Sequence, residues 1–193
     1  MVLILVAFGS AQAAPKPAVF EAAVSAGTLI LADSDPAVVS DGALRRIDAG
    51  VGIGALHVAG FASWSLHNGT WYGALEGTGS PIAGDFHLTR VGGVARWGPS
   101  FGRFAPSLRG EVGAITFLSP FDPDAYEQEV LPYTQNDELG IVNTGLLVGG
   151  GVDAAFAIIP EHAWAGLSID GAYNTLPGFG IEVGVRVGLM AAL

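Results

Sequence analysis

The stretch that decides the fold is Gly180-Ile181-Glu182-Val183-Gly184-Val185-Arg186-Val187-Gly188-Leu189. Its odd-numbered positions carry only isoleucine, valine and leucine, whereas its even-numbered positions carry glycine, one glutamate and one arginine. A period of two is that of a β-strand, because successive side chains point to opposite faces. One face can lie against lipid while the other carries diluted charges of both signs. This pattern is typical of the wall of a membrane β-barrel.

The composition favours a single all-β domain. Half of the 193 residues are hydrophobic and 13% are charged, but 29 glycines and regularly placed polar residues interrupt the apolar runs. No internal segment supplies the roughly 18 uninterrupted apolar residues that a membrane helix needs. The best helical candidate, 145–159, contains Asp153 and three consecutive glycines, which disfavour a helix.

The N-terminus has the features of a secretory signal peptide. An apolar run over 2–8 is followed by Ala11-Gln12-Ala13, an A-x-A cleavage motif. No lysine or arginine precedes the apolar run. We predict a signal peptide over 1–13, cleavage before Ala14, and an exported barrel domain over 14–193.

Cysteine content and charge exclude several classes of function. Because the chain has no cysteine, disulfides, thiolate metal sites and cysteine nucleophiles are excluded. Its formal net charge of −10, with eight lysines and arginines in total, argues against binding nucleic acid, which requires clustered basic residues.

Eight strand-like segments follow one another. We predict strands over 19–31, 44–66, 70–78, 86–97, 103–118, 139–158, 164–173 and 179–193. Long connections follow the first, third and fifth strands, whereas short turns follow the second, fourth and sixth, at 67–69, 98–102 and 159–163; the connection after the seventh is also short. Asn68-Gly69 is a preferred hairpin sequence. This alternation predicts an eight-stranded antiparallel up-and-down transmembrane barrel, with short periplasmic turns and both termini in the periplasm.

Side-chain phase supports a membrane barrel over a soluble sandwich. In the seventh strand, for example, Leu167 and Ile169 oppose Ser168 and Asp170. The polar face of a soluble sandwich usually carries many lysines and glutamates, whereas this chain has one lysine, Lys16. A soluble ligand-binding barrel of the lipocalin type stays open as the non-membrane alternative.

The four tryptophans predict an aromatic girdle near the periplasmic interface. They lie beside the proposed short turns, where such girdles occur. Two of them are out of phase with the lipid-facing residues, which predicts a β-bulge near Gly60. The girdle residues are Trp64, Trp71, Trp97 and Trp164.

From Val19 to Leu193 the chain resembles the small eight-stranded outer-membrane barrels: the transmembrane domain of outer-membrane protein A and the OmpX-like and opacity-like proteins. Arg186-x-Gly188-x-x-Ala191-x-Leu193 follows the spacing of their C-terminal assembly signal, with Leu193 where the family usually has phenylalanine. The resemblance implies a Gram-negative outer membrane and three partners: its lipid, lipopolysaccharide and the barrel-assembly machinery.

Acids and arginines collect on the inward phase. A closed eight-stranded barrel has room inside only for side chains, so we expect these groups to pair and plug the lumen. A narrow path for ions or small apolar molecules is the alternative. The inward glycines either permit strong coiling, which we favour, or leave a cavity. The predicted network is Glu21, Arg46, Asp48, Glu76, Arg90, Arg96, Arg109, Glu111, Asp153, Asp170, Glu182 and Arg186.

The connection over 119–138 is both acidic and aromatic, which suggests an outward interaction surface. Carboxylate pairs in the outer loops could attract calcium or magnesium, but none completes an EF-hand; we predict no specific metal site and no cofactor. The predicted interaction residues are Phe121, Asp122, Asp124, Tyr126, Glu127, Glu129 and Tyr133.

Candidates for catalysis are few. None of the four histidines forms the His-x-Ser pair of the lipid A deacylase barrels; His67 and His162 are expected in short turns, and His87 is expected on the outward phase. We therefore predict a non-enzymatic structural or surface-interaction protein of the outer membrane. A lipid A-modifying barrel enzyme is the third alternative, after the narrow channel.

Overall fold

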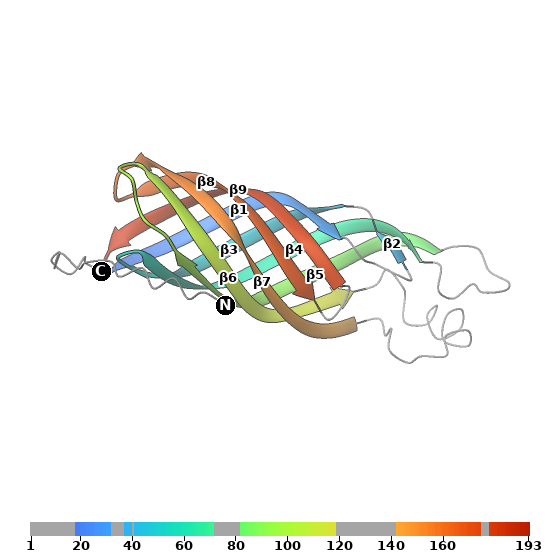
Figure 1. Cartoon of the computed structure of the whole chain (residues 1–193). Helices are drawn as coiled ribbons and strands as arrows, with labels where there is room; N and C mark the ends of the chain where they lie inside the picture. The colour runs from blue at the N-terminus through green and yellow to red at the C-terminus, as the bar shows by residue number, and fades with distance from the viewer. Residues whose placement is uncertain (1–17, 32–36, 40, 72–81, 119–141, 175–177) are drawn as a thin grey trace, which may run out of the picture.

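The computed structural model describes residues 18–31, 37–39, 41–71, 82–118, 142–174 and 178–193. These ranges form nine antiparallel strands (Figure 1). No helix long and apolar enough to cross a membrane occurs in them. The strands are β1 (Val19–Leu31), β2 (Ala37–Val39), β3 (Gly42–Ile53), β4 (Leu56–Trp71), β5 (Ile82–Trp97), β6 (Phe104–Leu118), β7 (Val142–Ile159), β8 (Ala163–Asn174) and β9 (Gly178–Ala192).

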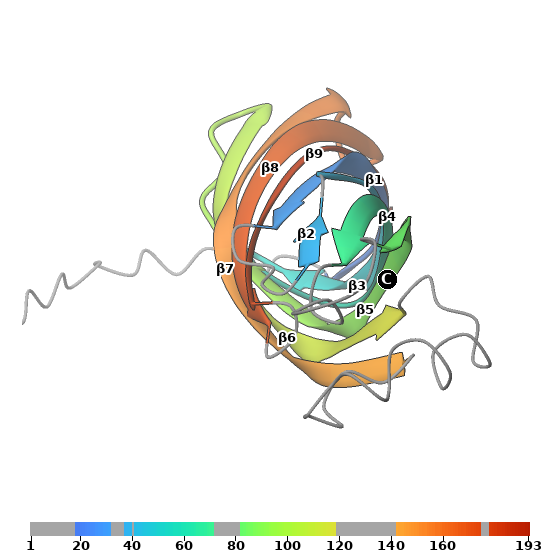
Figure 2. The same ribbon diagram turned by 90° about the vertical axis from the view of Figure 1, so that its right-hand side faces the viewer.

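Eight of these strands close into a barrel (Figure 2). Each barrel strand pairs with the next along the chain, and β1 closes the ring by pairing with β9 from Val19↔Ala192 to Leu31↔Gly180. The short strand β2 pairs only with the end of β4. The predicted eight-stranded up-and-down barrel is therefore confirmed.

Two predicted strand boundaries were wrong. The segment 44–66 is two strands, β3 and β4, joined by a tight turn at Gly54-Ala55, and Gly54 adopts a positive φ of 64°. Asn68-Gly69 is not a turn, because β4 continues through it to Trp71. The barrel still has eight strands, because the segment 44–66 is divided in two and residues 70 and 71 of the predicted strand at 70–78 belong to β4. Residues 72–78 lie outside the described ranges.

The predicted alternation of short and long connections is confirmed. The first short turn, however, lies at 54–55 and not at 67–69. The short turns lie at 54–55, 98–103 and 160–162, and each contains one residue with φ of 64°, namely Gly54, Gly102 or Glu161. The start of β1 lies at the same end of the barrel, where Leu193 N donates a hydrogen bond to Ala18 O (3.0 Å). We call this the terminus end and the opposite end the loop end.

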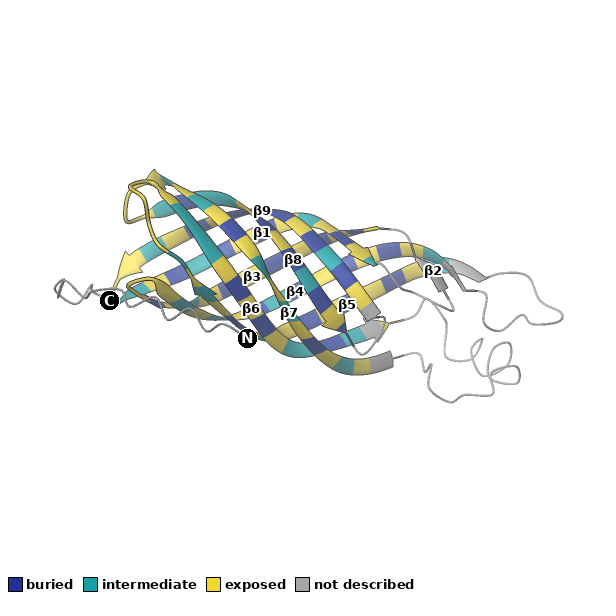
Figure 3. Ribbon diagram, viewed as in Figure 1, coloured by how far each residue is buried: buried dark blue, intermediate teal, exposed yellow. Residues whose placement is uncertain are grey.

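The two faces of the wall differ sharply in polarity. Figure 3 shows exposed residues alternating with buried or intermediate ones along most of each barrel strand. The outward residues are mainly valine, leucine, isoleucine and phenylalanine, whereas arginines and carboxylates are among the buried inward ones. Inward glycines permit close strand packing: a Cβ on Gly50 would lie 2.1 Å from Val58 O, and one on Gly113 would lie 2.2 Å from Val91 O. These distances support coiling rather than a cavity.

Candidate functional site: the charged lumen

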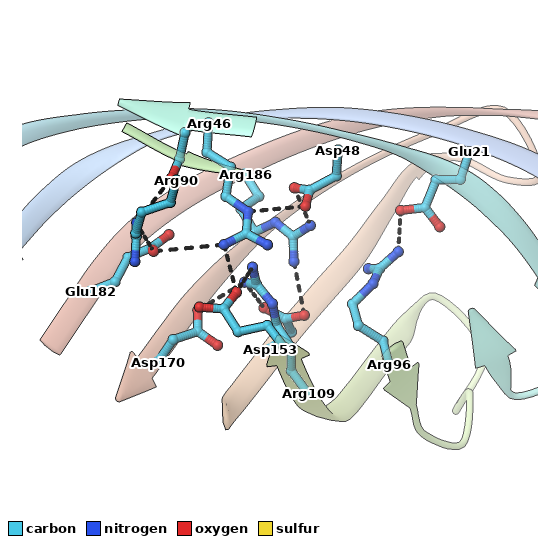
Figure 4. Close-up of polar contacts among 12 residues, drawn as sticks. Glu21, Arg46, Asp48, Arg90, Arg96, Arg109, Asp153, Asp170, Glu182 and Arg186 are labelled. Atoms are coloured by element: carbon cyan, nitrogen blue, oxygen red, sulfur yellow. Dashed lines mark hydrogen bonds and ion pairs between the residues drawn. The ribbon is translucent and has the colours of Figure 1, made fainter. Parts of the chain in front are cut away.

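The middle of the lumen holds one connected group of ion pairs, which we call the central network (Figure 4). Its four arginines and five carboxylates are buried and come from six strands, β3 and β5 to β9. Strand alternation places them inward, since each lies at an even spacing from the other inward residues of its strand. The members are Arg46, Asp48, Arg90, Arg109, Glu111, Asp153, Asp170, Glu182 and Arg186.

Arg46 lies at the centre of this network. Its Nε is 2.9 Å from Asp48 Oδ1 on the same strand, and its Nη1 is 2.7 Å from Glu111 Oε2 on β6. The guanidinium carbon also lies 3.9 Å from the ring centroid of Phe61. The planar guanidinium stays charged when buried and can bond several oxygens at once, so one side chain joins β3, β4 and β6.

Arg109 and Arg186 extend the network along the barrel. Arg109 Nη1 is 2.8 Å from Asp170 Oδ2, and its Nη2 is 3.2 Å from Glu111 Oε2. Arg186 bridges Asp153 on β7 and Asp48 on β3, at 2.9 and 3.0 Å. Both arginines therefore link strands that are not neighbours in the sheet.

Arg90 connects the network to β4 and β9. Its Nη2 is 2.7 Å from Glu182 Oε2, and its Nε donates a hydrogen bond to Ser63 Oγ (3.0 Å). Each central carboxylate thus has an arginine partner. No three carboxylate or imidazole groups of the described ranges are arranged to hold a metal ion.

A second charged group, the terminus-end cluster, consists of Glu21, His57 and Arg96. Glu21 accepts a hydrogen bond from Arg96, and its Oε2 lies 2.9 Å from His57 Nδ1. Trp164 lies close to both charged groups: the guanidinium carbons of Arg96 and Arg186 each lie 5.6 Å from its ring centroid. The two charged groups therefore meet through one aromatic ring.

The girdle prediction was wrong for Trp164. Its side chain faces the lumen and is 6% exposed, over Gly188 of the neighbouring strand. The even-numbered residues of β8 are the inward ones, and Trp164 shares their phase. The strand pattern, rather than proximity to a turn, determines its position.

The other tryptophans are also placed differently from the prediction. Trp64 is outward and 44% exposed, but it lies within β4 and not beside a turn. It is in phase because the Gly54-Ala55 turn separates β3 from β4, so the predicted bulge near Gly60 is absent from their register. Trp97 is 56% exposed at the terminus end. Trp71 ends β4 toward the loop end, and its side chain lies outside the described part.

Phenylalanine and tyrosine, which the sequence argument did not use, supply the aromatic side chains at both ends of the outer wall. Their outward phase in the strands was the available signal. Exposed examples are Phe20, Phe101, Phe104 and Phe156 toward the terminus end and Tyr173 and Phe179 toward the loop end.

A mostly apolar layer, which also holds the buried polar side chains of Ser65, His67 and Asn174, lies between the central network and the loop end. Its apolar members are six inward side chains, none more than 2% exposed: Leu29, Leu44, Phe86, Leu88, Ile115 and Leu147. We predicted a lumen filled by charged pairs, and this layer was not part of that prediction. The sequence did contain an indication of this layer: Leu44 and Leu88 lie two positions from Arg46 and Arg90, on the same inward face and toward the loop end.

The prediction that His67 lies in a short turn was wrong, because its side chain lies in the lumen. It is fully buried in β4, and its Nε2 is 2.9 Å from Ser65 Oγ. A hydroxyl beside an imidazole is one component of a nucleophilic site. Both groups are buried among the inward residues, so the pair has no open face toward lipid or solvent. His87 and His162 are not buried, as expected from their outward and turn positions.

Two sets of predicted residues lie outside the described ranges. Glu76 belongs to 72–81. The seven interaction residues of the outer loop, from Phe121 to Tyr133, belong to 119–141.

No protein-family model matches the chain, and no curated protein matches it in sequence. Solved structures do match. Surface protein A from Neisseria covers 92% of this chain and 99% of its own, at a TM-score of 0.58 and 14% identity. A major outer membrane protein from Thermus thermophilus covers 91% of this chain and 100% of its own, at a TM-score of 0.54 and 12% identity. The fold is that of the small eight-stranded outer-membrane β-barrels. At these identities the likeness concerns the fold alone.

Within this outer-membrane barrel fold, the described lumen carries one more carboxylate than arginine. Five arginines face Glu21 and the five carboxylates of the central network. Oxygen atoms such as Asp153 Oδ1 and Asp170 Oδ1 are buried without a hydrogen-bond donor among the described residues. The arrangement can hold strands together and exclude ions, and its polar atoms can also bind water.

Proposed function

We propose that this chain is an integral outer-membrane barrel with a structural or surface-interaction role, whose lumen is plugged by arginine–carboxylate pairs. The observation that carries the proposal is the inverted polarity of the wall. Large apolar side chains are exposed on the outside, while ten arginines and carboxylates of the two charged groups are buried inside. A water-soluble protein has the opposite arrangement, whereas a barrel in lipid requires this one.

The outer wall supports a membrane location in a second way. Aromatic side chains such as Trp97 and Phe104 lie at the terminus end, and others such as Tyr173 and Phe179 lie toward the loop end. Aromatic residues at both edges of an apolar band mark the two interfaces of a bilayer. The short turns would then face the periplasm, with the long connections outside.

Three successive layers support a closed lumen. From the terminus end these are the Glu21 cluster with Trp164, the central network, and the apolar layer near Leu44 and Leu88. An ion crossing the barrel would have to separate buried ion pairs and then lose its hydration in the apolar layer, and both steps are costly.

A narrow ion path is the second candidate. The surplus carboxylate favours it, as do the buried oxygens of Asp153 and Asp170 that accept no hydrogen bond from a described residue, since ionisable groups inside membrane proteins often line ion pathways. The apolar layer argues against it. A catalytic role has no comparable support, because the buried Ser65–His67 pair has no open face.

The remaining parts of the proposal come from the sequence. They are a cleaved signal peptide over 1–13, recognition of the C-terminal strand by the assembly machinery, contact with lipopolysaccharide, and partner binding by the acidic outer loop over 119–138. None of these functions requires a cofactor or a metal.

The experiment that tests the proposal is refolding into phosphatidylcholine vesicles, followed by planar-bilayer recording. We expect the protein to remain in the vesicles after a urea wash and to give no discrete conductance steps. A monodisperse folded protein in detergent-free buffer would refute the membrane assignment. Reproducible conductance steps would refute the plug, and release of an acyl chain from added lipid A would refute the non-enzymatic role.

A further inference from the structure

An apolar depression of about 910 Å³ lies on the outer wall, mainly across β9, β1, β3 and β4. Its lining is mostly apolar and outward-facing, and it also includes Asp48, Phe61 and Trp164, whose side chains face the lumen. The outward residues that shape it include Ala22, Val24, Ile47, Ala49, Gly60 and Ala62.

Strand register explains the depression. Ala22, Ala49 and Gly60 are successive cross-strand partners, so one row of the outer face carries no side chain larger than a methyl group. Val24 and Ile47 stand in the next row toward the loop end. The three small residues form the floor of the depression, and Val24 and Ile47 form its border on the loop side.

Arg45 stands directly above the depression on the loop side. It is exposed on the outward face of β3, two residues from Ile47, and its cross-strand neighbour is Trp64. On the outer face of the described strands it is the only arginine or lysine, and no ion pair joins it to another described residue. Unlike the cations of the lumen, this cation on an apolar wall therefore has no counter-charge among the described residues.

The depth of Arg45 fits the headgroup level of one leaflet. Asp41 and Asp85, both exposed, show where the outer face becomes aqueous near the loop end. Arg45 lies four residues inside Asp41, roughly 13 Å along the strand at a rise of about 3.3 Å per residue. A long arginine side chain extends from such a depth toward the interface, and Trp64 beside it is typical of the same level.

We infer that Arg45 and the depression form a binding site for a phosphate-bearing lipid of the loop-side leaflet. The Arg45 guanidinium donates charge-assisted hydrogen bonds to the phosphate, and one acyl chain lies in the depression over Ala49 and Gly60. A neutral lipid would fill the depression but leave Arg45 without an anion. The inference rests on the proposed membrane location.

Native mass spectrometry of the full chain in detergent, with dioleoyl phosphatidic acid as the probe, tests the site. The chain should retain one phosphatidic acid molecule at concentrations where it retains no dioleoylglycerol. Arg45→Gln should weaken retention about tenfold, in line with the loss of a charge-assisted contact. Gly60→Leu should weaken it as strongly by filling the depression; a Cβ there meets only Gly92 O, at 3.8 Å, so the barrel can accept the side chain.

Two matched variants serve as controls. Arg103→Gln removes an exposed charge from a short turn, and Gly110→Leu adds the same side chain to an outward glycine on β6 with open space around it. Both should retain phosphatidic acid like the unaltered chain. The site would be overturned if Arg45→Gln retained as much phosphatidic acid as the unaltered chain, or if a control variant lost as much as Arg45→Gln. It would also be overturned if inorganic phosphate displaced phosphatidic acid and retention did not depend on the acyl chains.

The same preparations separate this inference from the proposed function. If the chain does not insert into phosphatidylcholine vesicles, the membrane function fails and the lipid site fails with it. If the chain inserts but retains both lipids equally, only the lipid site is overturned.

Discussion

Arg46 Nη1 and Glu111 Oε2 lie 2.7 Å apart, although β3 and β6 are separated by two strands in the barrel wall. The pair therefore spans the lumen rather than bracing neighbouring strands. Both side chains are buried, so the removal of either takes one ion-pair partner from the other in a site from which bulk water is excluded.

Replacement of Arg46 with methionine should strongly destabilise the barrel. The variant leaves Glu111 and Asp48 short of a cation, and breaking a buried pair in this way costs about 3–5 kcal/mol. Arg103→Met, at an exposed turn, should change the unfolding free energy by less than about 1 kcal/mol. Urea unfolding in lipid vesicles measures both. Equal losses would mean that Arg46 does not hold the strands together.

Gly188 should not tolerate even a methyl group. A Cβ on Gly188 would lie 2.4 Å from Cε2 of the Trp164 ring, so Gly188→Ala must displace the ring from between Arg96 and Arg186. Overpacking of this kind costs about 1–3 kcal/mol. The loss should be visible as a lower urea midpoint and as a change in the near-ultraviolet circular dichroism of the tryptophans.

A double-variant cycle tests the cause of that loss. In a Trp164→Leu background, where the ring is absent, Gly188→Ala should cost much less, because residues in contact are not additive. Gly110→Ala provides the control, since a Cβ there meets nothing within 4 Å. If Gly188→Ala costs the same with and without the ring, the steric explanation is incorrect.

The sequence predicted the wall well because period-two alternation survives wherever a strand is unbroken. In β9 the inward Glu182 and Arg186 could be assigned from alternation alone, and in β8 the same parity correctly marked Trp164 as off the lipid face. Trp164 was assigned to the girdle because it lies beside a turn. The alternation of inward and outward residues in β8, which places it inward, should have had more weight.

Other features could not be predicted from local pattern. Gly54 follows Gly50 and Gly52, so the glycine that makes the first turn resembles its inward neighbours within the strand. Which arginine meets which carboxylate depends on contacts between residues as far apart as Arg186 and Asp48, and period two fixes the face but not the partner. The charged and apolar layers of the lumen also depend on register, because the pairing of all eight strands determines which inward residues lie at the same height in the barrel.

The three short turns make a prediction about backbone strain. Gly54, Gly102 and Glu161 all adopt φ of 64°, but only Glu161 has a Cβ, which in the left-handed region costs about 1–2 kcal/mol. Glu161 is exposed, so little packing is lost when its side chain is removed. Glu161→Gly should therefore stabilise the barrel, by up to about 1 kcal/mol after the greater flexibility of glycine in the unfolded chain is counted.

The reverse change at the first turn should have the opposite sign. Gly54→Ala places a Cβ in the same left-handed conformation and should destabilise the barrel by about 1 kcal/mol, although nothing lies within 4 Å of that Cβ to clash with it. Urea midpoints of the two variants, measured in the same vesicles, should lie on either side of that of the unaltered chain. A stabilising Gly54→Ala would show that this turn does not require the left-handed conformation.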